Sequence, residues 1–315
     1  MKRNISVLGA GYWGKNLIRN FSELGALKYV FDYDPKITSE FSKKYDLEIQ
    51  DLNQILKDED IEGIVVATPA HSHYEICKLC LEHNKNIFVE KPITLNVEQA
   101  EELISISKDK RRILMVGHLL HYHNHFIKFK ELISAKKESP LRIVSLRKSL
   151  GKIRDNENVL WSFAPHDISM INSIIPGEIS NIKKLERSYF NNNQDSVFLS
   201  FQKGQNKIFV DIEVDWVEIN KIQRISAYFS DEVIVFEDSE PDPGKKLYKL
   251  SIPFTKNQLM SKNNSDRSYI KVDQNNPLRS ECKHFLDCIT NESNPFTDGL
   301  EALEVLKYLI LLDEA

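Results

Sequence analysis

Short, continuously apolar segments alternate with amphipathic ones along the first 120 residues of the chain. Apolar runs of this length, bounded by polar or turn-forming residues, are typical of strands that are buried on both faces. Strands that alternate with helices predict a parallel sheet covered on both sides by helices. The predicted strands are residues 5–8, 29–32, 63–67, 86–89 and 113–116.

Helix signals occupy the segments between these strands. The apolar residues after the first strand recur at helical spacing and predict one face of a helix. They are Trp13, Leu17, Phe21 and Leu24. Further helix starts are predicted by a proline or a capping side chain, and one helix end by an asparagine suited to a left-handed cap. These residues are Pro35, Asp51, Asn96 with Gln99 in the capping-box position, and Asn84 after a helix at 71–82.

After residue 120 the pattern changes to one helix, at about residues 126–134, followed by strands of period two. Within residues 207–216 the apolar side chains of Ile208, Val210, Ile212, Val214 and Trp216 share one face. A strand of this kind belongs to an antiparallel sheet with one solvated or partner-covered face. Several such strands are predicted in residues 195–252, a mobile polar loop in 256–276, and helices at 278–290 and 300–312.

Two domains follow from this change of pattern and from the length of 315 residues. Residues 1–120 predict an α/β domain with a parallel sheet. Residues 121–315 predict an α+β domain with an open-faced, mainly antiparallel sheet, to which we assign the C-terminal helices within 278–312.

Composition narrows the class of protein. A net charge of −4 and a pI of about 6.2 argue against a nucleic-acid partner. No apolar run reaches the length of a membrane span, so no membrane association is expected. Four cysteines in a chain of this length do not make a disulfide framework, and we therefore expect a reducing, cytoplasmic environment.

A glycine motif follows the first predicted strand. In the spacing Gly-x-Gly-x-x-Gly, Gly9 allows a tight turn, Gly11 a close approach to a pyrophosphate, and Gly14 close packing of helix on strand. Asp32 ends the second strand at the spacing where a carboxylate binds ribose hydroxyls, and no arginine follows it. The motif therefore predicts a dinucleotide site that favours NAD over NADP; the alternative is a glycine turn needed only for packing.

Two residues are candidates for acid–base chemistry. Lys91 lies between Glu90 and Pro92 after a buried strand, and its amine beside a nicotinamide would have a lowered pKa and serve as a base. The alternative is a surface lysine on a loop. His166 is expected where a loop enters an apolar helix at 168–175, and the alternative there is a cap or a core histidine.

Two groups of histidine and cysteine residues have the residue types of a metal site but not the spacing. His121, His123 and His125 would face one way in an extended chain, yet no carboxylate or cysteine lies at ligand spacing nearby. Cys77 and Cys80 form one C-x-x-C pair within a predicted helix, without a second pair. We predict no metal site, with pocket lining or plain surface for the histidines and core packing for the cysteines.

Together these motifs resemble the glucose-fructose oxidoreductase, inositol dehydrogenase and MocA family. The most specific of them is Glu90-Lys91-Pro92, and His166 coincides with the family's second-domain histidine. The resemblance implies a Rossmann domain that binds NAD, and an open sheet that forms a homodimer or homotetramer. It also implies that Lys91 and His166 are an acid–base pair. The cofactor residues that it implies are Gly9, Gly11, Tyr12, Trp13, Gly14, Asp32, Thr68, Pro69, His73, Glu90 and Lys91.

Residues 11–17, and residues 151–154 with 161–167, further resemble the branch that oxidises nucleotide-linked amino sugars, notably the UDP-N-acetylglucosamine 3-dehydrogenases. That resemblance implies a 3-keto sugar passed to a pyridoxal-phosphate aminotransferase, as in lipid A or surface polysaccharide synthesis. One departure is Ser162, where many relatives carry an aspartate. The expected substrate residues are Lys91, Tyr122, Arg147, Lys152, Arg154, Ser162 and His166.

Several alternatives stay open at this point. Either Lys91 or His166 takes the proton from the sugar hydroxyl. The cations Arg147, Lys152 and Arg154 hold the diphosphate by forked hydrogen bonds, or they are ordinary solvated charges. The same fold and motifs would serve a ketoreductase acting on a keto-sugar nucleotide. A non-catalytic NAD-binding regulator is a third function, and the presence of Lys91 argues against it.

Overall fold

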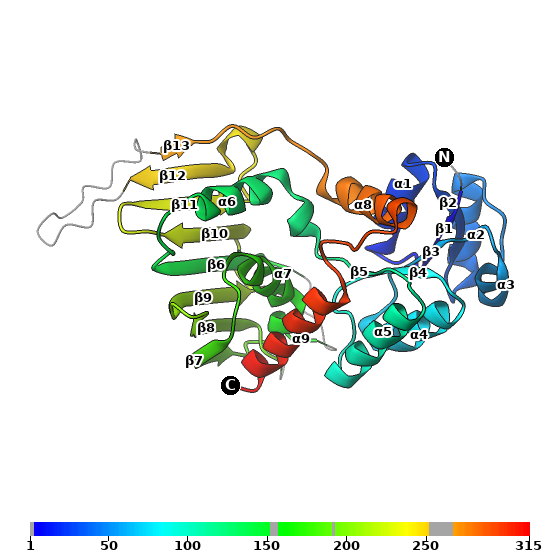
Figure 1. The fold of residues 1–315 in the computed structure, drawn as a ribbon, viewed down its shortest axis with the longest axis horizontal. Helices are drawn as coiled ribbons and strands as arrows, with labels where there is room; N and C mark the ends of the chain where they lie inside the picture. Colours follow the sequence, from blue (N-terminus) through cyan, green and yellow to red (C-terminus); the bar gives the residue numbers. More distant parts are fainter. Residues whose placement is uncertain (1–2, 152–156, 191–192, 252–266) are drawn as a thin grey trace, which may run out of the picture. The chain divides into compact units, whose positions relative to one another are not determined.

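The computed structural model describes residues 3–151, 157–190, 193–251 and 267–315. The chain folds into two compact units, each built on one sheet (Figure 1). The first comprises Met1–Tyr122 with Asn276–Lys307, and the second His123–Asn275 with Tyr308–Ala315. None of the helices in the described ranges combines the length and the apolar character needed to cross a bilayer.

The first unit alternates strands and helices, as the sequence pattern predicts. Its elements are β1 (Ile5–Leu8), α1 (Gly14–Glu23), β2 (Leu27–Phe31), α2 (Pro35–Tyr45), α3 (Leu52–Lys57), β3 (Gly63–Val66), η1 (Ala70–Ser72), α4 (His73–Glu82), β4 (Asn86–Val89), α5 (Val97–Asp109), β5 (Leu114–Val116), η2 (Leu119–Tyr122) and α8 (Pro277–Asn291). The first part of α9 (Gly299–Asp313) also belongs to this unit.

The five strands of this unit form a parallel sheet in the order β2-β1-β3-β4-β5. Every residue of β1, β3, β4 and β5 is buried, which explains their continuous apolar sequence. Local signals also act as predicted. Asp51 caps α3 in a capping box with Gln54, Asn96 caps α5, and Asn84 has a positive φ of 60°. The expected parallel α/β sheet is therefore confirmed.

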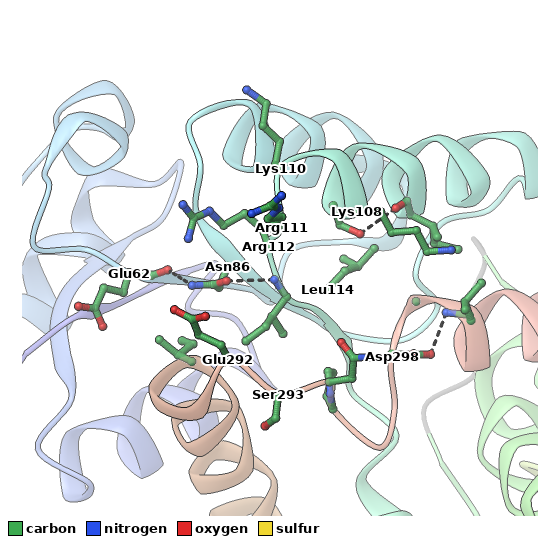
Figure 2. A pocket seen from close by; sticks show the side chains of 18 of the residues that line it. Glu62, Asn86, Lys108, Lys110, Arg111, Arg112, Leu114, Glu292, Ser293 and Asp298 are labelled. Carbon is green, nitrogen blue, oxygen red and sulfur yellow. Dashed lines mark hydrogen bonds between the residues drawn. The ribbon is translucent and has the colours of Figure 1, made fainter.

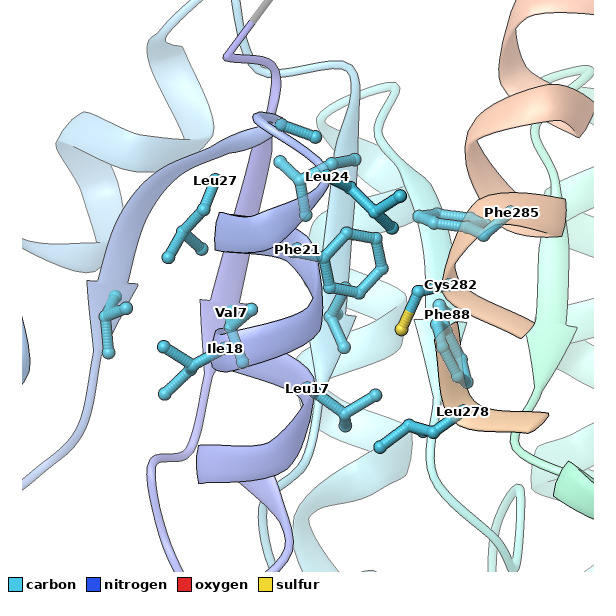
Figure 3. Close-up of a cluster of buried hydrophobic side chains, with 14 of the residues drawn as sticks. Val7, Leu17, Ile18, Phe21, Leu24, Leu27, Phe88, Leu278, Cys282 and Phe285 are labelled. Carbon is cyan, nitrogen blue, oxygen red and sulfur yellow. The ribbon is translucent and has the colours of Figure 1, made fainter. Parts of the chain in front are cut away.

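The core of the first unit depends on α8 as well as on the N-terminal helices. The ring of Phe285 packs edge-on against Phe21, with centroids 6.4 Å apart, and lies 5.7 Å from the ring of Phe88 (Figure 3). Leu278 and Cys282 on the same helix join this cluster. We expected the helices within 278–312 to belong to the second domain. The structure instead groups α8 and the first part of α9 with the first unit, because the apolar face of α8 completes the core there.

The second unit is built on a sheet of eight strands in the order β13-β12-β11-β10-β6-β9-β8-β7. All neighbours are antiparallel except β6 and β9, so the predicted mainly antiparallel sheet is confirmed. Its elements are α6 (Asn124–Ser134), β6 (Arg142–Lys148), α7 (Val159–Ile174), β7 (Ile179–Arg187), β8 (Ser196–Lys203), β9 (Ile208–Asp215), β10 (Ile222–Tyr228), β11 (Glu232–Glu237), η3 (Pro243–Lys245), β12 (Leu247–Ser251) and β13 (Arg267–Tyr269).

Strand β9 has the two faces that its alternating sequence predicts. Its even-numbered residues are buried, and α7 contacts this strand as well as β6 and β8 (Figure 1). On the other face Phe209 is 55% exposed, whereas Asp211 is buried by its ion pair with Arg142. The sheet thus has one face covered by helices within its own unit.

Two expectations for the second unit need comment. Helix α7 begins at Val159, capped by the Asn158 side chain, and contains Pro165. The prediction of a loop before residue 168 is therefore wrong. The helix loses only one backbone donor at the proline and continues through it. Of the predicted loop at 256–276, residues 256–266 lie outside the described residues, and β13 occupies Arg267–Tyr269.

Candidate functional site

The parallel sheet has a hollow at the edge where its strands end. This hollow has a volume of about 270 Å³ and lies among the last residues of β1 and β2 and the segment after β3. Ligands of open parallel sheets bind outside the carboxyl ends of the strands, where the loops diverge. The site that the motifs predict and the hollow therefore coincide. It is lined by Gly9, Gly11, Asp32, Thr68, Pro69 and neighbouring apolar residues.

A larger hollow of about 1090 Å³ lies in the same unit among residues that begin strands β4 and β5 (Figure 2). Lys110, Arg111 and Arg112 line one side, and Glu292 with Ser293, after α8, line the other. Because the amino ends of the strands form this edge, it is not the edge at which Rossmann folds bind their dinucleotide.

The glycine turn has the geometry that a dinucleotide requires. Gly9 has a φ of +92°, and a Cβ on Gly14 would lie only 2.0 Å from the carbonyl oxygen of Gly9. A Cβ on Gly11, by contrast, would meet nothing within 4 Å. Gly9 and Gly14 are thus needed for the turn itself, whereas the space beside Gly11 is open to a phosphate at the start of α1.

Asp32 follows β2 and turns its carboxylate toward the glycine turn. Its Oδ2 accepts a hydrogen bond of 2.8 Å from the backbone N–H of Ala10, and its Oδ1 one of 3.0 Å from that of Asp34. These bonds fix the carboxylate at the hollow, where its remaining lone pairs suit ribose hydroxyls. The residues after it, Tyr33 and Asp34, are exposed and carry no positive charge, which fits NAD better than NADP.

His73 joins the segment after β3 to the segment after β4. Its Nε2 lies 2.8 Å from the carbonyl oxygen of Thr68, and its Nδ1 lies 2.8 Å from that of Pro92. Burial lowers the pKa of this imidazole. The side chain therefore connects the two loops from inside the unit rather than facing a ligand, a role that the sequence motif alone did not reveal.

Lys91 follows β4 at the same edge of the sheet as the hollow, and its peptide bond to Pro92 is cis. Two histidines are close enough for its charge to act on them. Burial, with the charge of Lys91, lowers the pKa of His118 to about 3, and the same charge contributes to the lowered pKa of His73. Lys91 thus lies near the neutral imidazole of His118 and follows the carboxyl group of Glu90 in the chain.

Glu90 and Trp13, both expected at the cofactor site, are bonded to each other. The indole Nε1–H of Trp13 donates a hydrogen bond of 2.5 Å to Oε1 of Glu90. Tyr12, next to Trp13, is 83% exposed, with the ammonium group of Lys15 lying 4.8 Å from its ring centre. The turn and the Glu-Lys-Pro segment, separated by about 75 residues of chain, are therefore in direct contact.

His166 lies within α7 of the second unit, one helical turn after Ser162. Residues four apart lie on the same side of a helix, so the two side chains are neighbours. The Ser162 hydroxyl is buried and donates to Oε1 of Glu157 at 3.3 Å. His166 is partly exposed, as a histidine that meets a ligand must be.

Arg147 has a partner that the sequence analysis missed. Its Nε donates to Oδ2 of Asp167 at 2.7 Å and its Nη2 to Oδ1 at 3.3 Å, and the hydroxyl of Ser145 donates to Oδ1 at 2.6 Å. Asp167 is fully buried and Arg147 is 8% exposed. The sequence left two roles open for Arg147, a ligand of the diphosphate or an ordinary solvated charge. Neither describes it, because its guanidinium group is hydrogen-bonded to the buried carboxylate of Asp167 and so connects β6 to α7.

The remaining candidates are engaged elsewhere or lie outside the described residues. Tyr122 is buried in the first unit, with its hydroxyl 3.2 Å from the hydroxyl oxygen of Thr297. Lys152 and Arg154 lie outside the described residues. His123 pairs with Asp238 and His125 with the carbonyl oxygen of Pro243.

Possible metal ligands do not gather in the part of the chain that the structure describes. No group of three or more His, Cys, Asp or Glu side chains there is arranged to hold a metal ion. Cys77 and Cys80 are fully buried in α4, and burial raises the pKa of both thiols. Core packing therefore describes these cysteines, as predicted.

A parallel sheet with a glycine turn after its first strand and a carboxylate after its second defines a dinucleotide-binding Rossmann protein. Comparison with known proteins specifies the family. Residues 3–118 match the model of the glucose-fructose oxidoreductase, inositol dehydrogenase and MocA family, an oxidoreductase family with an NAD-binding Rossmann fold. The family predicted from the motifs is confirmed.

Three relatives illustrate the range of this family. The chain is 30% identical over 130 residues to 2,7-anhydro-N-acetylneuraminate hydratase of Mediterraneibacter gnavus, covering 41% of this chain and 35% of that protein. It is 25% identical over 188 residues to myo-inositol 2-dehydrogenase of Thermotoga maritima, covering 56% of each. It is also 25% identical over 118 residues to UDP-N-acetylglucosamine 3-dehydrogenase of Acidithiobacillus ferrooxidans, covering 37% of each.

The solved structure of that last enzyme has the same fold as this chain. The TM-score is 0.85 at 17% identity, covering 98% of this chain and 96% of that chain. In sequence, by contrast, this chain matches only 35% to 56% of the length of the three relatives named above. The shared fold extends over both units, whereas the match to the family model covers residues 3–118.

Proposed function

We propose that this protein is an NAD-dependent sugar dehydrogenase that oxidises the C3 hydroxyl of a nucleotide-linked amino sugar, UDP-N-acetylglucosamine. The 3-keto product would then pass to a pyridoxal-phosphate aminotransferase. The observation that carries the proposal is the position of Lys91. Its strand ends at the same edge of the sheet as the dinucleotide hollow, two strands from the glycine turn.

Bound NAD would accept the hydride from the sugar carbon. The glycine turn would hold the pyrophosphate through the N–H groups at the start of α1, and Asp32 would accept hydrogen bonds from the ribose hydroxyls. Lys91 Nζ or a ring nitrogen of His166 takes the hydroxyl proton as the carbon loses its hydride, which leaves a ketone. The neutral imidazole of His118 near Lys91 adds no positive charge, and the carboxylate form of Glu90 balances the charge of the ammonium form.

The choice of substrate rests on the relatives and on the sequence around Trp161 and His166. A relative named UDP-N-acetylglucosamine 3-dehydrogenase is 25% identical in the aligned part, and its structure shares the fold. Relatives of similar identity are named for inositol and for anhydro-N-acetylneuraminate, and these compounds are the competing substrates.

The test is formation of reduced nicotinamide by the purified protein with NAD and UDP-N-acetylglucosamine. A partner aminotransferase and glutamate remove the ketone and draw the reaction forward. We expect signal with NAD and little with NADP. Silence with this sugar, but signal with myo-inositol or with a keto-sugar nucleotide and reduced cofactor, would refute the substrate and leave the dehydrogenase fold in another role.

The role of Lys91 is tested by Lys91→Ala. We expect turnover to fall by about 10²–10⁴-fold, the range for a lost acid–base group, while NAD binding measured by calorimetry stays nearly unchanged. The matched control is Lys110→Ala, which removes an exposed lysine from the opposite edge of the same sheet. Full activity of Lys91→Ala would contradict the catalytic assignment, and a regulator would show NAD binding without turnover in any variant.

We also propose that the open face of the second sheet pairs two copies of the chain. Leu185 and Phe198 are paired across β7 and β8, and with Phe209 they are 38% to 55% exposed on one face. Exposed apolar groups on a sheet face are typical of an interface. Light scattering after Phe198→Lys should show a monomer, whereas Phe296→Lys, at another exposed phenylalanine, should leave the assembly intact.

A further inference from the structure

The carboxyl group of Glu90 is held between two segments of the first unit. On one side the Trp13 indole donates to its Oε1 at 2.5 Å. On the other, Gly117 follows β5, and a Cβ there would lie 3.0 Å from Oε2 and 3.1 Å from Oε1. The carboxyl group therefore lies close against the backbone of Gly117, and a Cβ at this position would require it to shift by a few tenths of an ångström.

The charged and titratable groups around Glu90 come from its own segment and from α8. Lys91 follows it in the chain, and the Lys91 charge acts on the carboxylate. The negative charge of Glu90 contributes to the raised pKa values of Glu281 and Cys282 on α8. Glu281 is 1% exposed, its Oε1 has no hydrogen-bond partner among the described residues, and burial raises its pKa well above the ordinary value. The pKa of His118, after Gly117, is lowered to about 3, so its imidazole is neutral.

We propose that Trp13 and Glu90 are a positioning pair for the dehydrogenase reaction: their hydrogen bond couples the dinucleotide turn to the Lys91 segment, and the coupling is strong only while Glu90 is ionised. An indole N–H bonds a carboxylate about twice as strongly as a neutral acceptor, which is the physical basis of the dependence. The pair acts through Lys91 and through the turn, not on the substrate. The inference rests on the proposed function for its catalytic meaning only.

The protonation of Glu90 falls in the physiological range. Burial raises its pKa to about 7, although the Trp13 hydrogen bond and the Lys91 charge both lower it. Above about pH 7 Glu90 is ionised and its hydrogen bond from the Trp13 indole is strong. Below that pH Glu90 is a neutral carboxylic acid and the hydrogen bond is weaker. NAD affinity should therefore fall as the solution is acidified through this range.

Nuclear magnetic resonance of the indole groups tests the pair without any turnover. The chain has three tryptophans, and the indole N–H of each donates to a different carboxylate: Trp13 to Glu90, Trp161 to Asp313 and Trp216 to Asp195. We expect the Trp13 resonance, assigned with Trp13→Phe, to shift with a midpoint near pH 7. The Trp216 resonance should stay constant, because hydrogen bonds from Trp216 and two backbone N–H groups hold the pKa of Asp195 low.

Variants complete the test. Glu90→Gln keeps an acceptor of the same shape but cannot titrate, so the shift of the Trp13 resonance should vanish. The matched control is Glu102→Gln, which removes a carboxylate bonded to another aromatic donor, Tyr74, at 2.6 Å in the same unit, and should leave the Trp13 titration unchanged. A Trp13 resonance that does not move between about pH 5 and about pH 9, or that still titrates in Glu90→Gln, would overturn the proposal.

Calorimetry gives the readout that links the pair to the cofactor. We expect wild-type affinity for NAD to fall several-fold from about pH 8 to about pH 6, while Glu90→Gln shows a flat profile. An unchanged pH dependence in Glu90→Gln would refute the coupling even if the resonance titrates. If the protein bound no NAD at all, the proposed function would fail, but the resonance titration would still decide whether the pair exists.

Discussion

Replacing Arg147 by methionine tests whether this arginine is an anchor inside the second unit or a phosphate ligand. Methionine keeps an unbranched, flexible side chain but removes the guanidinium group. In the structure that group makes two hydrogen bonds to Asp167, which also accepts one from the Ser145 hydroxyl. The substitution therefore leaves a fully buried carboxylate without its charged partner.

The size of the effect follows from the burial of both partners. The side chain of Arg147 is 9% exposed and that of Asp167 is 1% exposed. Breaking a buried ion pair by removing one partner costs about 3–5 kcal/mol, because the remaining charge keeps its desolvation penalty. An exposed pair is worth only about 0–1 kcal/mol. We therefore expect the second unit to lose about 3–5 kcal/mol of unfolding free energy in Arg147→Met.

Urea denaturation followed by circular dichroism measures this loss, with an internal control in the same unit. Lys128 on α6 pairs with Glu131, and their side chains are 43% and 58% exposed. Lys128→Met should cost less than about 1 kcal/mol. The double variant Arg147→Met with Asp167→Leu should recover most of the loss, because it leaves no buried charge without a partner.

A loss of less than about 1 kcal/mol in Arg147→Met would refute this reasoning, since the buried pair would then carry no more free energy than an exposed one. A weaker affinity for UDP-N-acetylglucosamine with unchanged stability would return Arg147 to the phosphate role that the sequence suggested. The two outcomes are separable, because one is read from unfolding and the other from binding.

Further predictions concern the first unit. Asp32→Ala should reduce the preference for NAD over NADP by at least about tenfold, because charge-assisted hydrogen bonds are worth about 1.5–3 kcal/mol; calorimetry with both dinucleotides measures it. Phe285→Ala should cost about 3–5 kcal/mol in urea denaturation, whereas Phe296→Ala, at a residue 71% exposed, should cost less than about 0.5 kcal/mol. Glu90→Gln should gain stability relative to the wild type as the pH rises. In the folded protein the pKa of Glu90 is raised from 4.5 to about 7, so its stabilising effect is complete below about pH 4.5 and is lost as the pH passes about 7. The change is about 3 kcal/mol at about 1.4 kcal/mol per unit, and parallel denaturation curves across that range would contradict it.

Local patterns predicted the first unit well. Strands such as β1 and β4 are short and buried on both faces, so their apolar runs are unambiguous, and caps such as Asp51 and Asn96 mark helix starts by chemistry within three residues. The glycine turn and Asp32 were likewise predictable, because their geometry depends on residues close in the chain and on one parallel neighbour.

The failures of prediction arise where distant residues decide the outcome. The helix was expected to begin at residue 168, yet α7 begins at Val159 and contains Pro165, and the cap at Asn158 was overlooked. The occupied fork of Arg147 depends on Asp167, twenty residues away, and the Trp13–Glu90 contact spans still more chain. Spacing and composition contain no information on such pairings, which are set only when the sheets assemble.

The discontinuous first unit has a consequence for synthesis of the protein. Its sheet and glycine turn are complete by Tyr122, but α8, which covers Phe21 and Phe88, follows only after residues 123–275. At about 5–20 residues per second, the ribosome needs roughly 8–30 s to make that insertion. During this interval the apolar side of α1 faces solvent or a chaperone, so the emerging Rossmann unit should be most prone to aggregation before the second unit has been made.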